Sequence, residues 1–208
     1  AKAALLHRYS FFIFLNCGVL GPFLQSPDDF WPESLIHPLR DGFTKLVGLS
    51  MNCQGKRGVV QAHVQSMLWG TDNVGLAVIM KSGVLFSCDG GVGVHGPDRD
   101  GFINRYELGL SRAVLGAGYG IRGLAPLQKD IIYTAANATK TPPLHVCRDL
   151  WTKEDFPSGM LFLKATRFPL PSSVLNKVIN RPRKNIAAGL YDPCTIMSTT
   201  AAGGGGGD

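Results

Sequence analysis

The residues most able to do chemistry lie between Asp98 and Glu107, in the stretch DRDGFINRYE. With Gly101 at the sixth position of an EF-hand loop, Asp98, Asp100 and Glu107 take three positions that ligate calcium in such loops. The first position would then be Gly96, which has no carboxylate, and a glycine-rich stretch stands where the entering helix should lie. Calcium binding through Asp98, Asp100 and Glu107 is therefore the weaker interpretation of this stretch.

Glu107 also has a structural interpretation. Asn104 as an N-cap, followed three residues later by Glu107, forms a capping-box pattern at the start of a helix.

Two further polar residues stand beside apolar strands. Asn16 follows the run Phe11–Leu15, where the crevice of an α/β sheet opens, and His63 begins the apolar stretch HVQSMLW. A lone histidine more often has a hydrogen-bonded structural role than a catalytic one.

The elements that must position these residues follow from apolar patterning. The uninterrupted run Phe11–Leu15 is typical of a strand buried on both faces. Further strands are expected at 45–51, 63–69, 84–87, 119–124 and 160–165. Asp72 is expected to cap a helix over 73–81, and apolar residues at helical spacing predict a second helix over 105–117. The sequence thus predicts an α/β protein with a mostly parallel central sheet flanked by these two helices.

Composition excludes several classes of protein. The chain has 208 residues and a formal charge of +6, but six bases and no acid lie between 156 and 191, and the rest of the chain is neutral. This charge distribution does not favour nucleic-acid binding; the basic segment is interpreted as a solvated tail, with membrane-surface or RNA contact as the alternative. No apolar run approaches the length of a transmembrane span. The residues from 169 to 208 form a basic, Pro/Gly-rich tail that we expect to be disordered, after a domain over 1–168.

The five cysteines are widely spaced, with no C-x-x-C motif and no Cys/His cluster at zinc spacing. Buried free thiols are therefore expected, although spacing does not fix the compartment. Asn137-Ala138-Thr139 is an N-glycosylation sequon, which has meaning only in a chain that enters the secretory pathway. The sequence contains no G-x-S-x-G motif, no Walker loop and no G-x-G-x-x-G after a strand.

Several segments, in order, resemble a little-characterised glycosyltransferase family of algae and bacteria, similar to the rhamnan-synthesis and capsule-type enzymes with a GT-A-like core. They cover about two-thirds of the chain. The similar segments are FFIFLNCGVLGPFL (11–24), FTKLVGLSMNC (43–53), HVQSMLWGTDNVGLAVI (63–79), YELGLSRAVLGAGYGI (106–121) and MLFLKATR (160–167). The resemblance implies a nucleotide-sugar donor, a glycan or polysaccharide acceptor, and a location in the Golgi or secretory pathway or at the cytoplasmic membrane face.

The resemblance also implies roles for particular residues. Glu107 corresponds to an acidic residue that faces the acceptor hydroxyl and would act as general base in an inverting displacement. Asn16, His63, Gln65 and Asp72 are the substrate-binding candidates. In GT-A enzymes, the strand that corresponds to Phe11–Leu15 is followed by acidic residues that hold a metal and the donor diphosphate. This chain has Asn16-Cys17-Gly18 there, which argues against a metal at that position.

The chain begins at Ala1 without a Met and soon enters a strand, so we expect a fragment that corresponds to the acceptor-side half of such an enzyme. A truncated non-catalytic remnant that acts as a binding module is the alternative. If the enzyme interpretation holds, Asn16 and Glu107 lie on the same side of the sheet, on the order of 10 Å apart, and His63 borders the same opening.

Overall fold

The structure is a computed structural model that describes residues 8–16, 18–23, 29–54, 60–85, 103–126, 128–139 and 161–164. All of these residues belong to one compact unit, Ala1–Thr166. The second unit, Arg167–Asp208, lies outside the described residues, so the predicted disordered tail and the boundary at 168 stay predictions. The predicted strand at 84–87 is wrong where the structure describes it, because Val84 and Leu85 form a turn.

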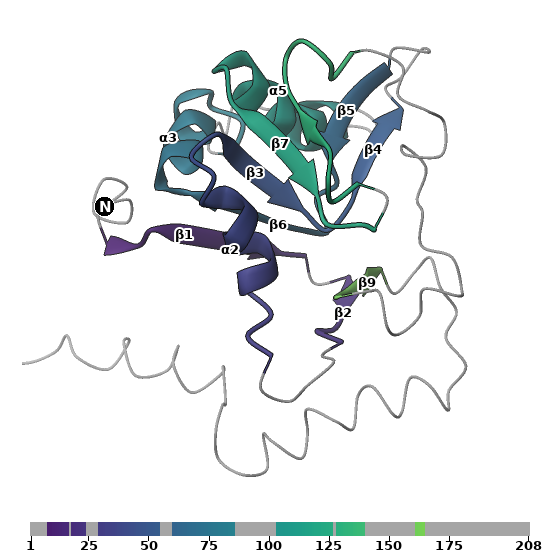
Figure 1. The fold of residues 1–208 in the computed structure, drawn as a ribbon. Helices are drawn as coiled ribbons and strands as arrows, with labels where there is room; N and C mark the ends of the chain where they lie inside the picture. Colours follow the sequence, from purple (N-terminus) through teal and green to yellow (C-terminus); the bar gives the residue numbers. More distant parts are fainter. Residues whose placement is uncertain are drawn as a thin grey trace, which may run out of the picture. The chain divides into compact units, whose positions relative to one another are not determined.

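The described chain alternates short strands with a few helices (Figure 1). The strands are β1 (Phe11–Leu15), β2 (Val19–Leu20), β3 (Thr44–Gly48), β4 (Met51–Gln54), β5 (Val60–Val64), β6 (Leu68–Asp72), β7 (Gly120–Gly123), β8 (Ile132–Tyr133) and β9 (Leu163–Lys164). The helical elements are α2 (Glu33–Leu39), α3 (Asn73–Lys81), the π-helical turn η2 (Ile103–Glu107) and α5 (Leu108–Gly116). The two predicted helices are thus present as α3 and as η2 with α5.

The central sheet has the strand order β1-β6-β3-β7-β8, and only the β3–β7 pair is parallel. The prediction of a mostly parallel sheet is therefore wrong, and the α/β class is right only in the broad sense of a mixed fold. The physical reason lies in the connections. Strands β3 to β6 follow one another through links that are too short for the crossover that parallel pairing requires.

Strand β1 differs most from its expected position. It lies at the edge of the sheet, paired only with β6 among the described strands, and its residues are half-buried or exposed rather than buried on both faces. Its main anchor is Phe14, whose ring stacks on Trp69 of β6 with centroids 3.9 Å apart. An apolar run without alternation therefore marks an edge strand here, held by its ladder to β6 and by the Phe14–Trp69 pair.

The helices cover both faces of the sheet (Figure 1). A Cβ added at Gly70 of β6 would meet Leu35 of α2, whereas the neighbouring Thr71 approaches Gly75 of α3. Since successive residues of a strand point to opposite faces, α2 lies on one face and α3 on the other. Among the described residues, no helix has the length and apolar character needed to span a membrane.

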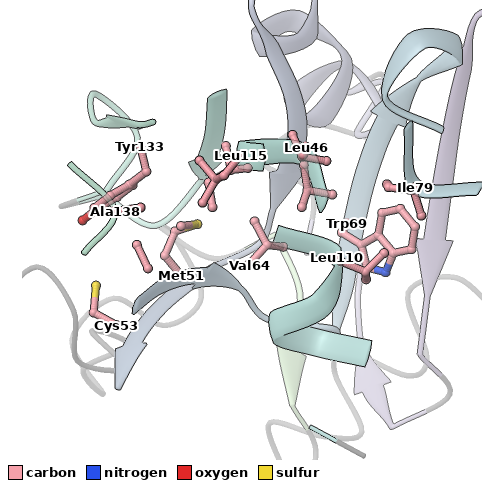
Figure 2. Close-up of a cluster of buried hydrophobic side chains, with 13 residues drawn as sticks. Leu46, Met51, Cys53, Val64, Trp69, Ile79, Leu110, Leu115, Tyr133 and Ala138 are labelled. Atoms are coloured by element: carbon pink, nitrogen blue, oxygen red, sulfur yellow. The ribbon is translucent and has the colours of Figure 1, made fainter. Parts of the chain in front are cut away.

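The main core lies between the sheet, the β4–β5 hairpin and α5 (Figure 2). Aliphatic side chains dominate it, and Trp69 and Tyr133 close its two ends. Its buried members are Leu46, Met51, Cys53, Ala62, Val64, Trp69, Ile79, Leu110, Val114, Leu115, Ile121, Tyr133 and Ala138. This core fixes α5, and with it Glu107, against β5.

Candidate functional site

The site is built on an irregularity in a long hairpin. Strand β3 pairs antiparallel with β6, and the following strand β4 pairs antiparallel with β5. Leu49 and Ser50 connect β3 to β4 on one side, and residues 65–67 connect β5 to β6 on the other. The amide of Leu49 donates to the carbonyl of Leu68 (3.0 Å), and the amide of Gln65 donates to the carbonyl of Ser50 (3.0 Å). Ser66 and Met67 are therefore two extra residues on one side of the hairpin, and we call this pair the bulge. Bulges of this kind interrupt strand pairing and leave main-chain groups to be bonded from elsewhere.

Two segments that are distant in sequence bond these main-chain groups. The amide of Asn16, just past β1, donates to the carbonyl of Met67 (2.9 Å). The amide of Ser66 donates to Oε1 of Glu107 (3.2 Å), at the end of η2. Asn16, through its main-chain amide, and Glu107, through its side chain, thus bond adjacent residues of the bulge, so both lie at this end of the sheet. The predicted separation of about 10 Å between their side chains and the shared opening stay predictions. Whether they carry chemistry remains a prediction.

This end of the sheet is where strands of like direction finish. In the registers, Leu15 of β1 pairs with Leu68 of β6, Gly48 of β3 pairs with Trp69, and Gly48 also pairs with Gly123 of β7. The carboxyl ends of β1, β3 and β7 therefore lie together at the bulge.

Asn16 offers a hydrogen-bond donor at this end. Its side chain is exposed, and its Oδ1 accepts from the amide of Gly18 (2.9 Å), which holds the amide plane in place. Among the described residues Nδ2 has no partner. Asn16 can therefore donate to a sugar hydroxyl or a phosphate oxygen, which is its predicted role.

Glu107 reaches the bulge from the helix side. Its carboxylate is half-buried, and only Oε1 has a hydrogen-bond partner among the described residues, the Ser66 amide. The capping-box interpretation is wrong, because the helical turn η2 already begins at Ile103 and includes Asn104. The second oxygen, Oε2, is left to bond a ligand or a water molecule.

His63 is next to this carboxylate. Its side chain is 2% exposed, and Nδ1 lies 2.8 Å from the carbonyl oxygen of Gln61. A carbonyl only accepts, so we assign the proton to Nδ1, and Nε2 is then the acceptor atom of the ring. Burial lowers the pKa of His63 below 6.5 and outweighs the Gln61 hydrogen bond and the Glu107 charge, both of which raise it. His63 is therefore neutral at pH 7.

Residues that the sequence did not single out complete this region. Arg112 of α5 donates from Nε to Oε1 of Gln61 (2.9 Å), and its charge opposes protonation of His63. Ser111 is fully buried, and its Oγ accepts from the amide of Val64 (2.9 Å). A possible signal for Ser111 is its position one helical turn after Glu107 in an otherwise apolar helix face.

Two predicted binding residues have structural partners instead. Gln65 is 5% exposed, and its Oε1 accepts from Oγ of Ser50 (2.6 Å) across the hairpin. Asp72 lies at the other end of β6, opposite Phe11, on the order of 13 Å from the bulge at the usual rise of a strand. The structure therefore does not bring Asp72 to the site.

Asp72 occupies a cluster of its own. Its Oδ1 accepts from the Gly75 amide (2.8 Å), which confirms the predicted N-cap of α3, and its Oδ2 lies 2.6 Å from Nζ of Lys45. Lys45 and Asp72 are 5% and 8% exposed. Both carboxylate oxygens are thus already bonded within the protein.

Asp98 and Asp100 lie outside the described residues, so the calcium interpretation stays a prediction. In the part of the chain that the structure describes, no group of three or more His, Cys, Asp or Glu residues could hold a metal ion. Glu107, the third residue of the calcium interpretation, accepts a hydrogen bond from the Ser66 amide.

Cys53 of β4 differs from expectation. It is buried in the core and disulfide-bonded, so the prediction of free thiols is wrong at this position. The other four cysteines lie outside the described residues. Spacing alone could not reveal this bond, because the distance between two sulfurs depends on tertiary packing and not on separation in sequence.

Comparisons of the chain with protein-family models, with curated proteins and with solved structures found no match.

Proposed function

We propose that this chain is the acceptor-side portion of a nucleotide-sugar-dependent glycosyltransferase with a GT-A-like core, which transfers a sugar to a glycan or polysaccharide acceptor. The observation that carries the proposal is the meeting of Asn16 and Glu107 on adjacent bulge residues, at the end of the sheet where β1, β3 and β7 finish. An exposed amide donor and a half-buried carboxylate, brought together from separate elements, suit a sugar bound between them.

Glu107 is the proposed general base. In an inverting displacement its carboxylate takes the proton of the acceptor hydroxyl, that oxygen bonds the anomeric carbon of the donor, and the nucleoside diphosphate leaves. The Ser66 amide holds Oε1, so the orientation of the carboxylate is fixed and Oε2 faces the acceptor. This arrangement separates the anchoring oxygen from the reacting one.

Neighbouring groups support the carboxylate and bind the sugar. Neutral His63, oriented by the Gln61 carbonyl and buried beside Glu107, supports the carboxylate from within the fold. Asn16 donates through Nδ2 to the sugar or the diphosphate, at the position where, by the resemblance, GT-A enzymes carry acidic residues. The disulfide at Cys53 supports a location in an oxidising compartment such as the secretory pathway.

The test is a transfer assay of the full chain. A panel of uridine, guanosine and thymidine diphosphate sugars is offered with polysaccharide acceptors, and release of nucleoside diphosphate is measured. Glu107→Gln keeps an oxygen for the Ser66 amide but cannot act as base, so we expect turnover to fall at least about 100-fold with an unchanged melting temperature. Glu33→Gln, in the exposed ion pair of Glu33 with Arg40, is the matched control and keeps full turnover. Equal turnover in Glu107→Gln and the wild type would refute the catalytic assignment.

One observation favours a second function, that of a non-catalytic binding module. The hydrogen bond from Ser66 gives Glu107 a structural role in closing the bulge, which requires no reaction. A binding module would bind nucleotide sugar or glycan in calorimetry, release no nucleoside diphosphate, and bind equally well with Gln at 107. Turnover by the wild-type chain would exclude this alternative.

A further inference from the structure

A turn after β8 carries the single N-glycosylation sequon of the sequence, Asn137-Ala138-Thr139. The amides of Asn137 and Ala138 both donate to the carbonyl of Thr134, at 3.2 and 2.9 Å. Ala135 and Ala136, at the tip of the turn, are exposed, and so is Thr139. Asn137 itself is half-buried, so the sequon lies at the surface with exposed residues on both sides of it.

The side chain of Asn137 closes this turn in a specific way. Its Oδ1 accepts from the Thr134 amide (2.6 Å), and its Nδ2 donates to the carbonyl of Ile132 (3.1 Å). A primary amide nitrogen carries two hydrogens. The second has no partner among the described residues, so a glycan can replace it while the hydrogen bond to Ile132 is kept.

The middle residue of the sequon, Ala138, is packed against β5, and this limits the stage of folding at which a glycan can be added. Ala138 is 2% exposed, and its carbonyl accepts from the amide of Ala62 in β5 (2.9 Å). Once the turn has packed on β5, the segment cannot be drawn into the extended form that an enzyme needs for access. Glycan addition at Asn137 thus precedes docking of this turn.

The disulfide at Cys53 is an independent observation about the compartment. Disulfides persist in oxidising environments such as the endoplasmic reticulum lumen. Oligosaccharides are added to sequons in proteins that enter the same pathway. Cys53 and Ala138 belong to one core cluster, so the bond and the sequon are in the same folded unit.

We propose that Asn137 is an N-glycosylation site of this protein, modified before the turn packs against β5. In the reaction Nδ2 bonds the anomeric carbon of an oligosaccharide carried on a lipid diphosphate. The bond from that carbon to the phosphate oxygen breaks, the lipid diphosphate leaves, and Nδ2 gives up one proton. No oxidant or reductant is needed. The inference does not depend on the proposed glycosyltransferase activity.

The test is production of the full chain behind a cleavable secretory leader in a eukaryotic host, followed by peptide mass spectrometry before and after treatment with peptide N-glycosidase. We expect the wild-type chain and Thr139→Ser to carry one oligosaccharide at Asn137, and the enzyme to leave aspartate there. Thr139→Ala removes the acceptor motif but leaves both Asn137 hydrogen bonds, so it should be unglycosylated and equally able to fold. An unmodified Asn137 in wild-type chain that has entered the lumen and formed the Cys53 disulfide would overturn the proposal.

Discussion

Each end of strand β6 carries a group of polar residues, and the two groups differ in whether their polar atoms are already bonded. At the Asp72 end, the carboxylate bonds both Lys45 and the Gly75 amide, and Thr71 bonds the Lys45 carbonyl (2.6 Å). At the bulge end, Asn16 Nδ2, Glu107 Oε2 and His63 Nε2 have no hydrogen-bond partner among the described residues. Bonded polar atoms stabilise a fold, whereas unbonded ones can bind a substrate.

The comparison also shows why residue type alone misleads. Asp72 and Glu107 are both carboxylates beside the first turn of a helix, and both were candidates for a role in substrate binding or catalysis. Asp72 is enclosed by its partners, whereas Glu107 is half-buried at a strand bulge.

Asp72→Ala should have the largest effect. It removes the cap of α3 and leaves the Lys45 ammonium buried without its partner, which costs about 3–5 kcal/mol of unfolding free energy. Urea denaturation measures the loss. The control Glu33→Ala breaks the exposed pair with Arg40 and should cost no more than about 1 kcal/mol. Equal losses in the two variants would show that the Asp72 end is not a structural cluster.

Gly48→Ala should be the next most damaging change, because it alters the hairpin beside the bulge. A Cβ at Gly48 would lie 2.2 Å from Cγ1 of Val64, so the core must shift, at about 1–3 kcal/mol. Gly116→Ala is the matched control. It lies at the end of α5 with nothing within 4 Å of an added Cβ, and it should be neutral or slightly stabilising. The melting temperatures of the two variants are compared by thermal unfolding. An unchanged melting temperature for Gly48→Ala would show that the hairpin adjusts to the added methyl group without loss of stability.

Glu107→Ala should cost about 1 kcal/mol, because the Ser66 amide loses its acceptor in a half-buried location. Glu107→Gln keeps an acceptor oxygen and should cost clearly less in the same urea experiment. If both variants were as stable as the wild type, the Ser66 bond would contribute nothing and the carboxylate would not be anchored.

The fold was predicted well where local sequence decides it. Asp72 as the N-cap of α3 and the periodic helix around α5 depend on residues within a few positions of each other. The edge position of β1, by contrast, depends on pairing with β6, more than fifty residues away, and no property of Phe11–Leu15 itself specifies that. Apolar content shows that a strand will be buried to some extent, but not which neighbours it has.

The candidate site was predicted in part for the same reason. Residue type and strand position proposed Asn16 and His63, and the family resemblance proposed Glu107. The hydrogen bonds that hold this candidate site connect residues as far apart as Ser66 and Glu107. Gln65 and Asp72 are also polar and were also predicted to bind substrate. Their side chains instead bond residues distant in sequence, Ser50 and Lys45. The Cys53 disulfide is likewise a tertiary contact.

The smallest expected effect is on the pH dependence of stability. Burial holds the pKa of folded His63 below its ordinary 6.5, so the unfolded chain binds more protons as the pH falls through 6.5. Stability should therefore fall from pH 7 to pH 5, and part of that slope should disappear in His63→Gln. Burial raises the pKa of Asp41, but hydrogen bonds from Thr44 and Phe43 outweigh it and hold that pKa below 3.8, so the stability that Asp41 contributes is lost only below about pH 4 and does not affect this slope. Parallel slopes for the two proteins would mean that His63 is not buried in its neutral form.

The most direct test of the difference between the two ends of β6 is a nuclear magnetic resonance titration of the ¹⁵N-labelled full chain with the nucleotide sugar that gives turnover, or with uridine diphosphate if none does. The account predicts that the amide signals of Asn16, Ser66 and Met67 shift, and that those of Asn73 and Gly75 at the Asp72 end do not. Shifts confined to the Asp72 end, or no shifts at millimolar ligand, would contradict the assignment of the bulge as the functional site.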